Sequence, residues 1–228
     1  MYRIINAMSK TAIIIGATGL TGGILLKNLI ADPSYEKIKL FSRSAVSNTS
    51  LKVEEYIIDL FRIGEYKDQF VGDEVFCCIG TTSAKTKDKE LYRAIDYGIP
   101  VNAAKLAIEN NIKTFLVISS MGANVSSSIF YNKTKGEMER DVLALNIKNT
   151  YILRPSLIGG KRHEFRMGER IAKGLMSFLS PLFLGALKKY KIISPENIVA
   201  CMQNLVKNEV QQTLFSSDKI VTLANLKK

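Results

Sequence analysis

The chain has 228 residues, of which 46% are hydrophobic and 23% charged, which is ordinary for a soluble globular protein. This length suits one α/β domain, so we predict a single domain over 1–228 with a C-terminal substrate or lid portion over 156–228. The net charge of +11 leaves nucleic acid, an acidic surface and phosphorylated ligands open as partners. Because the lysines are spread along the chain, we favour a solvated basic surface with a phosphate site, and no nucleic acid.

The cysteine and histidine residues indicate the cellular compartment and whether a metal cofactor is expected. Cys77 and Cys78 are neighbours in an apolar run and should point to opposite faces of a strand, whereas Cys201 lies in a helical pattern. Free thiols and a start without the apolar core of a signal peptide predict a cytoplasmic protein. His163 is the one histidine, and C-x-x-C does not occur, so we expect no metal.

The first predicted unit is a strand, a tight glycine turn and a helix. The apolar run Ala12–Ile15 leads into the turn Gly16-Ala17-Thr18-Gly19-Leu20-Thr21-Gly22, and a helical pattern follows. The first glycine allows the sharp turn, the second a close approach of backbone to a ligand, and the third packing of helix on strand. The free N–H groups and the positive dipole at the helix start suit a pyrophosphate. The alternative is a plain glycine turn of a βα unit.

Further strands and helices alternate along the rest of the chain. We predict strands at 37–41, 53–58, 74–79, 114–118 and 150–153. We predict helices over 87–110 with a break at Gly98 and Pro100, over 131–145 with Glu137, Glu139 and Arg140 on the wet face, and from Pro195 with Ser194 as its cap. The stretch 214–223 fits either an edge strand or a short helix.

Regular alternation of strands and helices indicates a parallel sheet covered on both faces. With right-handed crossovers, the predicted fold class is α/β, a doubly wound Rossmann-type sheet with a small C-terminal helical lid.

Ligands of such sheets bind at the carboxyl ends of the strands, so the residues after each strand are candidates for a dinucleotide site. An acidic residue after the second strand would hold a ribose 2′-hydroxyl, whereas arginine there suits a 2′-phosphate and favours NADP(H); the alternative is a surface arginine. We expect Asp59 and Leu60 to flank the adenine ring of the cofactor. We expect the turn after the fourth strand to lie beside the cofactor's ribose. The candidates are Arg43 and Ser44, then Asp59 and Leu60, then Ile79, Gly80 and Thr81, and then Ser119 and Ser120.

Tyr131 and Lys135 form the candidate catalytic pair, since residues four apart share one face of a helix. The Lys135 ammonium would stabilise the ionised phenol and hold the nicotinamide ribose, so that Tyr131 acts as proton donor or acceptor. Ser120 or Ser119 could hydrogen-bond the same substrate oxygen. Tyr35 begins the same spacing but follows no serine pair, so we discard it. The alternative for Tyr131 is a side chain packed at a helix start.

These motifs resemble the atypical short-chain dehydrogenase/reductase superfamily, in its Tat-interacting-protein-like branch, over about residues 11–166. The residues that carry the resemblance are Phe76-Cys77-Cys78-Ile79-Gly80-Thr81-Thr82, Ser119-Ser120-Met121-Gly122-Ala123, Tyr131 with Lys135-Gly136-Glu137-Met138-Glu139, and Arg154-Pro155. The resemblance implies an NADP-binding Rossmann domain with Tyr131 as proton donor or acceptor. It implies cofactor contacts from Thr18, Gly19, Leu20, Thr21, Arg43, Ser44, Gly80, Tyr131, Lys135, Ile158 and Arg166.

The predicted function is an NADP(H)-dependent oxidoreductase that transfers a hydride to or from a small carbonyl or alcohol substrate. The alternative is an NADP(H)-binding regulatory or scaffold protein with vestigial catalysis. A sugar-nucleotide epimerase or dehydratase uses the same residues, but the short part after Pro155 argues against it. The apolar segment 174–187 is too short, and too broken by Pro181, to span a bilayer, and it fits a substrate pocket, a membrane-surface patch, a lid or a subunit contact. We expect a monomer or homodimer.

Overall fold

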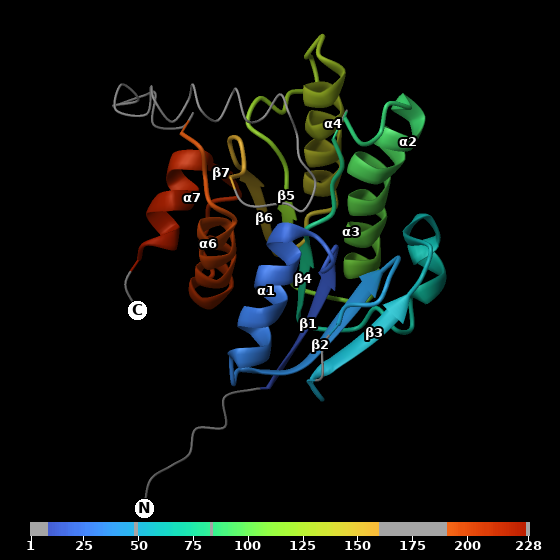
Figure 1. The fold of residues 1–228 in the computed structure, drawn as a ribbon, viewed down its shortest axis with the longest axis vertical. Helices are drawn as coiled ribbons and strands as arrows, with labels where there is room; N and C mark the ends of the chain where they lie inside the picture. Colours follow the sequence, from blue (N-terminus) through green and yellow to red (C-terminus); the bar gives the residue numbers. More distant parts are fainter. Residues whose placement is uncertain (1–8, 48–49, 83, 160–190, 227–228) are drawn as a thin grey trace, which may run out of the picture.

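Seven strands form one parallel sheet in the computed structural model, which describes residues 9–47, 50–82, 84–159 and 191–226. The strand order is β3-β2-β1-β4-β5-β6-β7, so the chain winds outward in both directions from β1 (Figure 1). This order confirms the predicted doubly wound Rossmann-type sheet. The strands are β1 Lys10–Ile15, β2 Tyr35–Ser42, β3 Val53–Ile57, β4 Glu74–Cys77, β5 Thr114–Ile118, β6 Asn149–Arg154 and β7 Leu214–Ser216.

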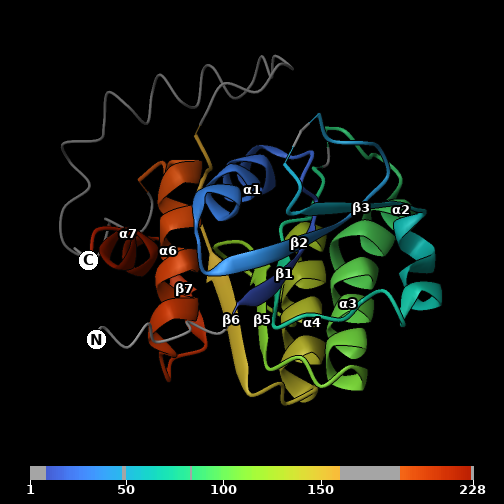
Figure 2. The ribbon, with the colours of Figure 1, turned by 90° about the horizontal axis from the view of Figure 1, so that it is seen from below.

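Helices cover both faces of the sheet. α1, α6 and α7 pack on one face, and α3 and α4 pack on the other with the 3₁₀-helix η1 (Figures 1 and 2). Two apolar cores therefore lie on either side of the strands. The helices are α1 Leu20–Ala31, η1 Leu60–Tyr66, α2 Lys89–Arg93, the π-helix η2 Ala94–Gly98, α3 Ile99–Glu109, α4 Phe130–Ala144, α6 Pro195–Asn208 and α7 Ser217–Ala224.

Strand β1 shows why the middle of the sheet is built from apolar runs. Ala12 and Ile14 belong to the core under α1 and α6, whereas Ile13 and Ile15 belong to the core under α3 and α4. Successive side chains of a strand point to opposite faces, so a strand covered on both sides buries every side chain. Each such isoleucine contributes roughly 1.5–3 kcal/mol of burial free energy, which holds β1 at the centre of the sheet.

The glycine turn after β1 requires glycine for two different reasons. Gly16 has a φ of +90°, in the left-handed region that favours glycine. A Cβ on Gly22 would lie 2.3 Å from the carbonyl oxygen of Gly16, so any side chain there would collide with backbone. The sharp turn and the close packing of helix on strand are thus as predicted.

Strand β4 ends at Cys77, two residues before the predicted end at Ile79. A Cβ on Gly16 would lie 3.0 Å from the carbonyl carbon of Cys78, so the glycine turn crosses the chain where the strand stops. Cys77 faces the α3 side and Cys78 packs toward the α1 side, as predicted for adjacent strand residues. Both are free thiols, and burial raises the pKa of Cys77 to about 12.

The predicted break at Gly98 and Pro100 does not occur. α2, η2 and α3 run on without interruption, and Gly98 has helical backbone angles of −63° and −51°. Pro100 has no N–H to donate and its ring crowds the carbonyl four residues back, at Asp96. The π turn of η2 widens the helix there, and the Ile99 N–H bonds to the Ala94 oxygen instead.

The prediction that Glu139 lies on the wet face of α4 is wrong. Its carboxylate is only 4% exposed and accepts hydrogen bonds from the Arg154 guanidinium at the end of β6. Arg140 is exposed as predicted, and Glu137, which pairs with Arg93, is half-buried. A buried glutamate next to an arginine from another element cannot be recognised from the helix pattern alone.

The described part of the C-terminal portion adds both to the sheet and to its cover. Ser194 accepts a hydrogen bond from the Asn197 N–H and caps α6, as predicted. The stretch 214–223 forms both expected elements, an edge strand and then a helix, β7 and α7. The apolar segment 174–187, with His163 and Arg166, lies outside the described residues.

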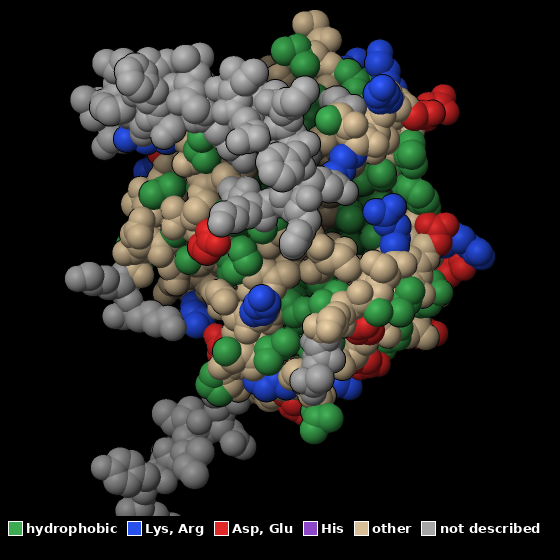
Figure 3. All heavy atoms as spheres, viewed as in Figure 1, with side chains coloured by type: hydrophobic (Ala, Val, Ile, Leu, Met, Phe, Trp, Pro, Cys, Tyr) green, Lys and Arg blue, Asp and Glu red, His purple; other side chains and the backbone are tan. Residues whose placement is uncertain are grey.

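The net positive charge is distributed over the surface. On the face drawn in Figure 3, Lys and Arg side chains stand singly or in small groups, with Asp and Glu beside several of them. Exposed pairs such as Arg62 with Glu65 and Lys67 with Glu109 fit this picture of a solvated surface.

Substituting Gly22 tests the close packing of the glycine turn. Gly22→Ala forces a Cβ against the Gly16 carbonyl and should lower the free energy of unfolding by about 2 kcal/mol or more. The control is Gly98→Ala, where a Cβ meets nothing within 4 Å and the backbone is helical, so stability should rise by about 0.5–1 kcal/mol. Urea denaturation measures both, and a neutral Gly22→Ala would contradict the packing.

Candidate functional site

The order of the strands reverses between β1 and β4, which is where doubly wound sheets bind their ligands. The glycine turn after β1, the turn after β4 and the loop after β5 all leave the same end of the sheet (Figure 1). α4 begins at this end too, so its first turns face the same region.

The amino end of α1 leaves backbone N–H groups available to a ligand. Gly19 is the N-cap, no side chain caps the helix, and its first turn has no acidic residue. Gly19 donates its own N–H to the Gly16 oxygen and so closes the turn. Thr18 and Gly19 are exposed, Leu20 is half-buried, and Thr21 is buried. An anion such as a pyrophosphate fits this end, and these cofactor contacts stay a prediction.

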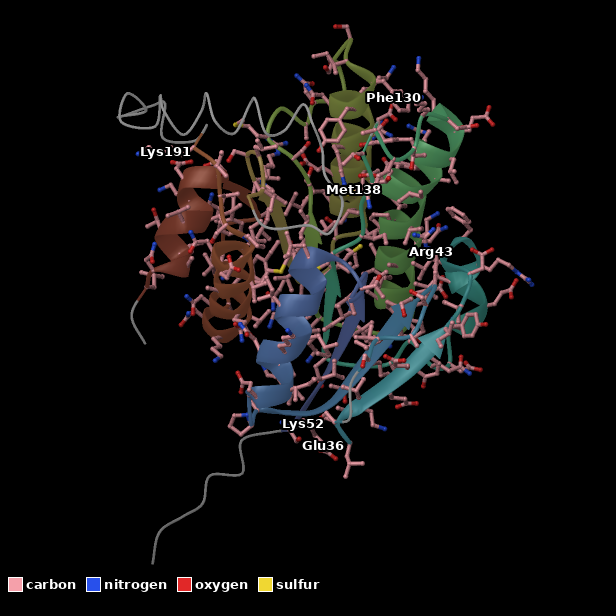
Figure 4. All side chains as sticks on the ribbon, in the orientation of Figure 1. Glu36, Arg43, Lys52, Phe130, Met138 and Lys191 are labelled. Atoms are coloured by element: carbon pink, nitrogen blue, oxygen red, sulfur yellow. The ribbon has the colours of Figure 1, made fainter. Side chains whose placement is uncertain are left out.

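Arg43 extends from the loop directly after β2. Figure 4 shows it at the end of the sheet opposite to Glu36 and Lys52. The side chain is exposed and forms no ion pair within the described part of the chain. Ser42, which the sequence analysis did not single out, is buried and donates its hydroxyl to the Ser44 oxygen at 2.8 Å. This bond fixes the turn that carries Arg43 and Ser44.

Asp59 and Leu60 have structural tasks. The Asp59 carboxylate accepts the Phe61 N–H and caps η1, and Leu60 is buried in the core on the α3 side. Their position beside an adenine stays a prediction. Ile158 lies after β6 and pairs with Ile193 in an isolated bridge, and it is half-buried against the core under α1. Its cofactor contact also stays a prediction.

Lys135 is the centre of the site. Its ammonium lies 2.8 Å from an Asp96 carboxylate oxygen, and the two side chains are only 3% and 1% exposed. It also donates to the Ile118 carbonyl oxygen at 3.3 Å, at the end of β5. The other Asp96 oxygen accepts the Thr81 N–H at 2.8 Å, beyond the end of β4. The ion pair therefore joins α4 and η2 to the ends of two central strands.

The charge of Lys135 depends on its neighbours. Burial would lower the pKa of Lys135, but Asp96, then Tyr131 and Cys77, raise it, and the net pKa lies above the ordinary value of lysine. Lys135 therefore keeps its proton through the neutral range. Its stabilising contribution is present below the unfolded pKa and is lost only as the pH rises through the folded pKa.

Tyr131 belongs to an aromatic cluster at the start of α4. It is half-buried, and its ring contacts Tyr92 edge to face with 6.1 Å between centroids. Tyr92 contacts Phe130 in the same way at 5.6 Å (Figure 4 labels Phe130). Burial raises the pKa of Tyr92, and Asp96 and Tyr131 raise it further, so its phenol stays neutral.

Three buried hydroxyl groups near the ion pair have no hydrogen-bond partner among the described residues. They belong to Tyr92, Ser119 and Ser120. Ser119 and Ser120 directly follow Ile118, whose carbonyl Lys135 contacts. Buried hydroxyls are normally satisfied, so unpaired ones point to a site that is completed by a ligand or water. The glycine turn, the uncapped α1, the exposed Arg43 and these hydroxyls together fit a phosphorylated dinucleotide.

The described part of the chain contains neither a metal site nor a membrane-spanning helix. Within it, no three His, Cys, Asp or Glu side chains gather as a metal site requires. Nor does a helix in these ranges have the length and apolar character to cross a bilayer. Tyr35, which we discarded as a catalytic candidate, lies at the start of β2, at the opposite end of the sheet from the candidate site. Its hydroxyl donates a hydrogen bond to Glu74 at the start of β4.

Asp96 and Tyr92 are the residues that the sequence analysis missed. The one available signal for Asp96 is Pro100, whose missing N–H predicts a disturbed helix turn four residues earlier. Tyr92 has no such signal, because an aromatic residue at helical spacing looks like core.

The fold defines the class: a Rossmann-type α/β protein with a doubly wound parallel sheet. The pattern that defines the HIM1 family matches residues 39–189. The mitochondrial protein FMP52 of Candida albicans is 35% identical over 93% of this chain and 97% of its own length. Protein HTATIP2 of Rattus norvegicus is 33% identical over 71% and 70%. The chain belongs to the HIM1 family, together with the FMP52 and HTATIP2 proteins, which confirms the predicted resemblance.

Solved structures with this fold include sugar-nucleotide epimerases. The ADP-L-glycero-D-manno-heptose-6-epimerase of Helicobacter pylori superposes with a TM-score of 0.67 at 18% identity, over 98% of this chain and 84% of that one. The UDP-glucuronic acid 4-epimerase of Bacillus cereus, solved with NAD, gives 0.65 at 12%, over 90% and 76%. At these identities the likeness establishes the fold and leaves the reaction open.

The prediction of a cytoplasmic protein is wrong. The FMP52 relatives from Candida albicans, Scheffersomyces stipitis, Debaryomyces hansenii and Eremothecium gossypii are named as mitochondrial proteins. Free thiols fit a reducing environment but do not identify which compartment provides it.

Two tyrosine variants test the unpaired hydroxyl of Tyr92. Tyr92 and Tyr35 are each 2% exposed, but only the Tyr35 hydroxyl has a partner, Glu74. Tyr92→Phe removes an unsatisfied polar group and should raise the free energy of unfolding by about 1 kcal/mol, whereas Tyr35→Phe should lower it by about 2 kcal/mol. Chemical denaturation of the cofactor-free protein measures both. Equal losses in the two variants would show that Tyr92 does have a partner.

Proposed function

We propose that the protein is an NADP(H)-dependent oxidoreductase that transfers a hydride to or from a small carbonyl or alcohol compound. The observation that carries the proposal is a buried Lys135, paired with Asp96 at 2.8 Å and one helical turn from Tyr131, at the carboxyl end of the sheet. The Lys135 ammonium lies 3.9 Å from where a Cβ on Gly80 would stand, so it faces the turn after β4. The intact pair favours an enzyme, because a protein that only senses the cofactor needs no proton donor.

Each residue of the site has a stated task in this proposal. A nicotinamide cofactor supplies the hydride when bound. In the reduction the Tyr131 hydroxyl gives a proton to the carbonyl oxygen, and in the reverse reaction the Tyr131 phenolate takes the proton of the alcohol. The Lys135 ammonium binds the ribose, and Ser119 or Ser120 donates a hydrogen bond to the reacting oxygen. Burial of the ion pair excludes water, and electrostatic interactions are stronger in the resulting low-dielectric environment.

A panel of carbonyl compounds with NADPH, and of alcohols with NADP⁺, tests the function directly. Once a substrate is found, Tyr131→Phe should lower its turnover on the order of 10²-fold, because the proton donor is lost. Tyr66→Phe is the control, since Tyr66 ends η1 and packs on the core of the α3 side. Unchanged turnover in Tyr131→Phe would remove the phenol from the mechanism. Tight NADPH binding without turnover on any compound would favour the regulatory alternative.

Arg43 is assigned to the 2′-phosphate, which distinguishes NADPH from NADH. Arg43→Ala should weaken NADPH binding about tenfold to 100-fold, because a charge-assisted contact is lost, and should change NADH binding less than about twofold. Arg140→Ala removes the same charge from an exposed position on α4 and should leave both affinities unchanged. Fluorescence titration measures the four dissociation constants. Equal losses for NADPH and NADH would contradict the assignment.

A further inference from the structure

We propose that Asp96 is the positioning residue of this site, where its carboxylate holds the Lys135 ammonium and the Thr81 backbone in one fixed arrangement. The inference rests on the proposed function, because it says how the lysine of that site is held and kept charged.

The two carboxylate oxygens of Asp96 have different partners. One lies 2.8 Å from the Lys135 ammonium, and the other accepts the Thr81 N–H at 2.8 Å. A Cβ on Gly80 would stand 3.4 Å from the first oxygen, so Asp96 lies directly under the turn that we expect to pass the cofactor ribose. One buried side chain therefore links the lysine of α4 to this turn.

Asp96 lies in a π-helical turn rather than in a regular α-helical one. η2 is a π-helix, and its extra residue per turn arises where Pro100 denies a hydrogen bond to the Asp96 carbonyl. π turns inside α-helices occur frequently at functional sites. Within this turn Asp96 is the buried residue, whereas Ile95, Tyr97 and Gly98 are half-buried.

The negative charge of Asp96 is what keeps Lys135 protonated. The groups that face the lysine are Asp96 from η2, Tyr131 from α4 itself and Cys77 from β4, and Tyr92 of α2 faces Asp96. Burial alone favours neutral lysine, by up to roughly 3–5 pKa units for a fully buried group. Without the carboxylate, Lys135 would lose its proton at a lower pH and with it the charge that binds ribose and supports Tyr131.

Asp96→Asn removes the negative charge of residue 96 and keeps its hydrogen bond with the Thr81 N–H. The amide oxygen of asparagine still accepts the Thr81 N–H, but the partner charge of Lys135 is gone. NADPH is titrated by fluorescence against the wild type and the variant between about pH 7 and pH 10. We expect an affinity in the wild type that is independent of pH, and in Asp96→Asn a loss of about tenfold or more that grows as the pH rises.

The cofactor-free protein supplies a second readout, the pH dependence of the free energy of unfolding. In the wild type Lys135 is protonated in both states below its unfolded pKa, so it contributes no slope there. In Asp96→Asn the folded protein binds fewer protons than the unfolded chain, so stability should rise with pH by the equivalent of about one proton. An unchanged slope would mean that Asp96 does not hold the charge of Lys135.

Glu74→Gln is the matched control for a merely structural ion pair. Glu74 is a buried carboxylate that also pairs with a lysine, Lys10 at 2.6 Å, but it starts β4 at the opposite end of the sheet. Glu74→Gln should lose stability and keep both the NADPH affinity and its pH profile. If Asp96→Asn behaves like Glu74→Gln, with wild-type NADPH affinity at every pH, the ion pair is structural only and the inference is overturned.

Lys135→Met tests whether Asp96 acts through the lysine, and it still decides the question if Asp96→Asn alone does not fold. Asp96→Asn added to Lys135→Met leaves no unpaired buried charge. We expect the double variant to bind NADPH within about twofold of Lys135→Met. A further tenfold loss would show that Asp96 acts independently of the lysine. A wild type that does not bind NADPH overturns the proposed function, and the inference with it.

Discussion

The buried ion pair between Lys135 and Asp96 constrains the arrangement of the whole ligand-binding end of the sheet. Taking two charges out of water costs several kcal/mol for each ion, and their attraction offsets this only when the geometry is good and the remaining polar atoms are bonded. Here the remaining bonds go to the Ile118 carbonyl and the Thr81 N–H, so β5, β4, η2 and α4 must all meet at one point. Displacing any of these elements leaves a buried charge unpaired.

Family and fold answer different questions about this protein. The shared fold extends to epimerases at 12–18% identity, so a doubly wound sheet with a glycine turn says little about the reaction. The reaction must follow from the site: Tyr131 on the first turn of α4, Lys135 one turn later, and two buried serine hydroxyls at the end of β5. The unpaired Tyr92 hydroxyl in the same cluster shows that stability was not maximised at this end of the sheet.

Much of the architecture could be predicted because its signals are local. β1 is apolar and buried from Ala12 to Ile15 because both faces of the sheet are covered there, and three glycines mark the first crossover. Tyr131 and Lys135 share a helix face because of the helical period alone. The compartment could not be predicted in this way, since the thiols and the start of the chain constrain it only weakly.

Local spacing in the sequence therefore determined the alternation of strands and helices, the glycine turn, and the helix face that Tyr131 and Lys135 share. Only the tertiary structure decided which charges are buried and with what partner: Asp96 with Lys135, and Glu139 with Arg154. The physical reason is that side chains of a helix or strand return to the same face every few residues, so their pattern can be recognised in the sequence. An ion pair joins residues that crossovers bring together, and a carboxylate on a helix looks the same in sequence whether it meets water or a buried lysine.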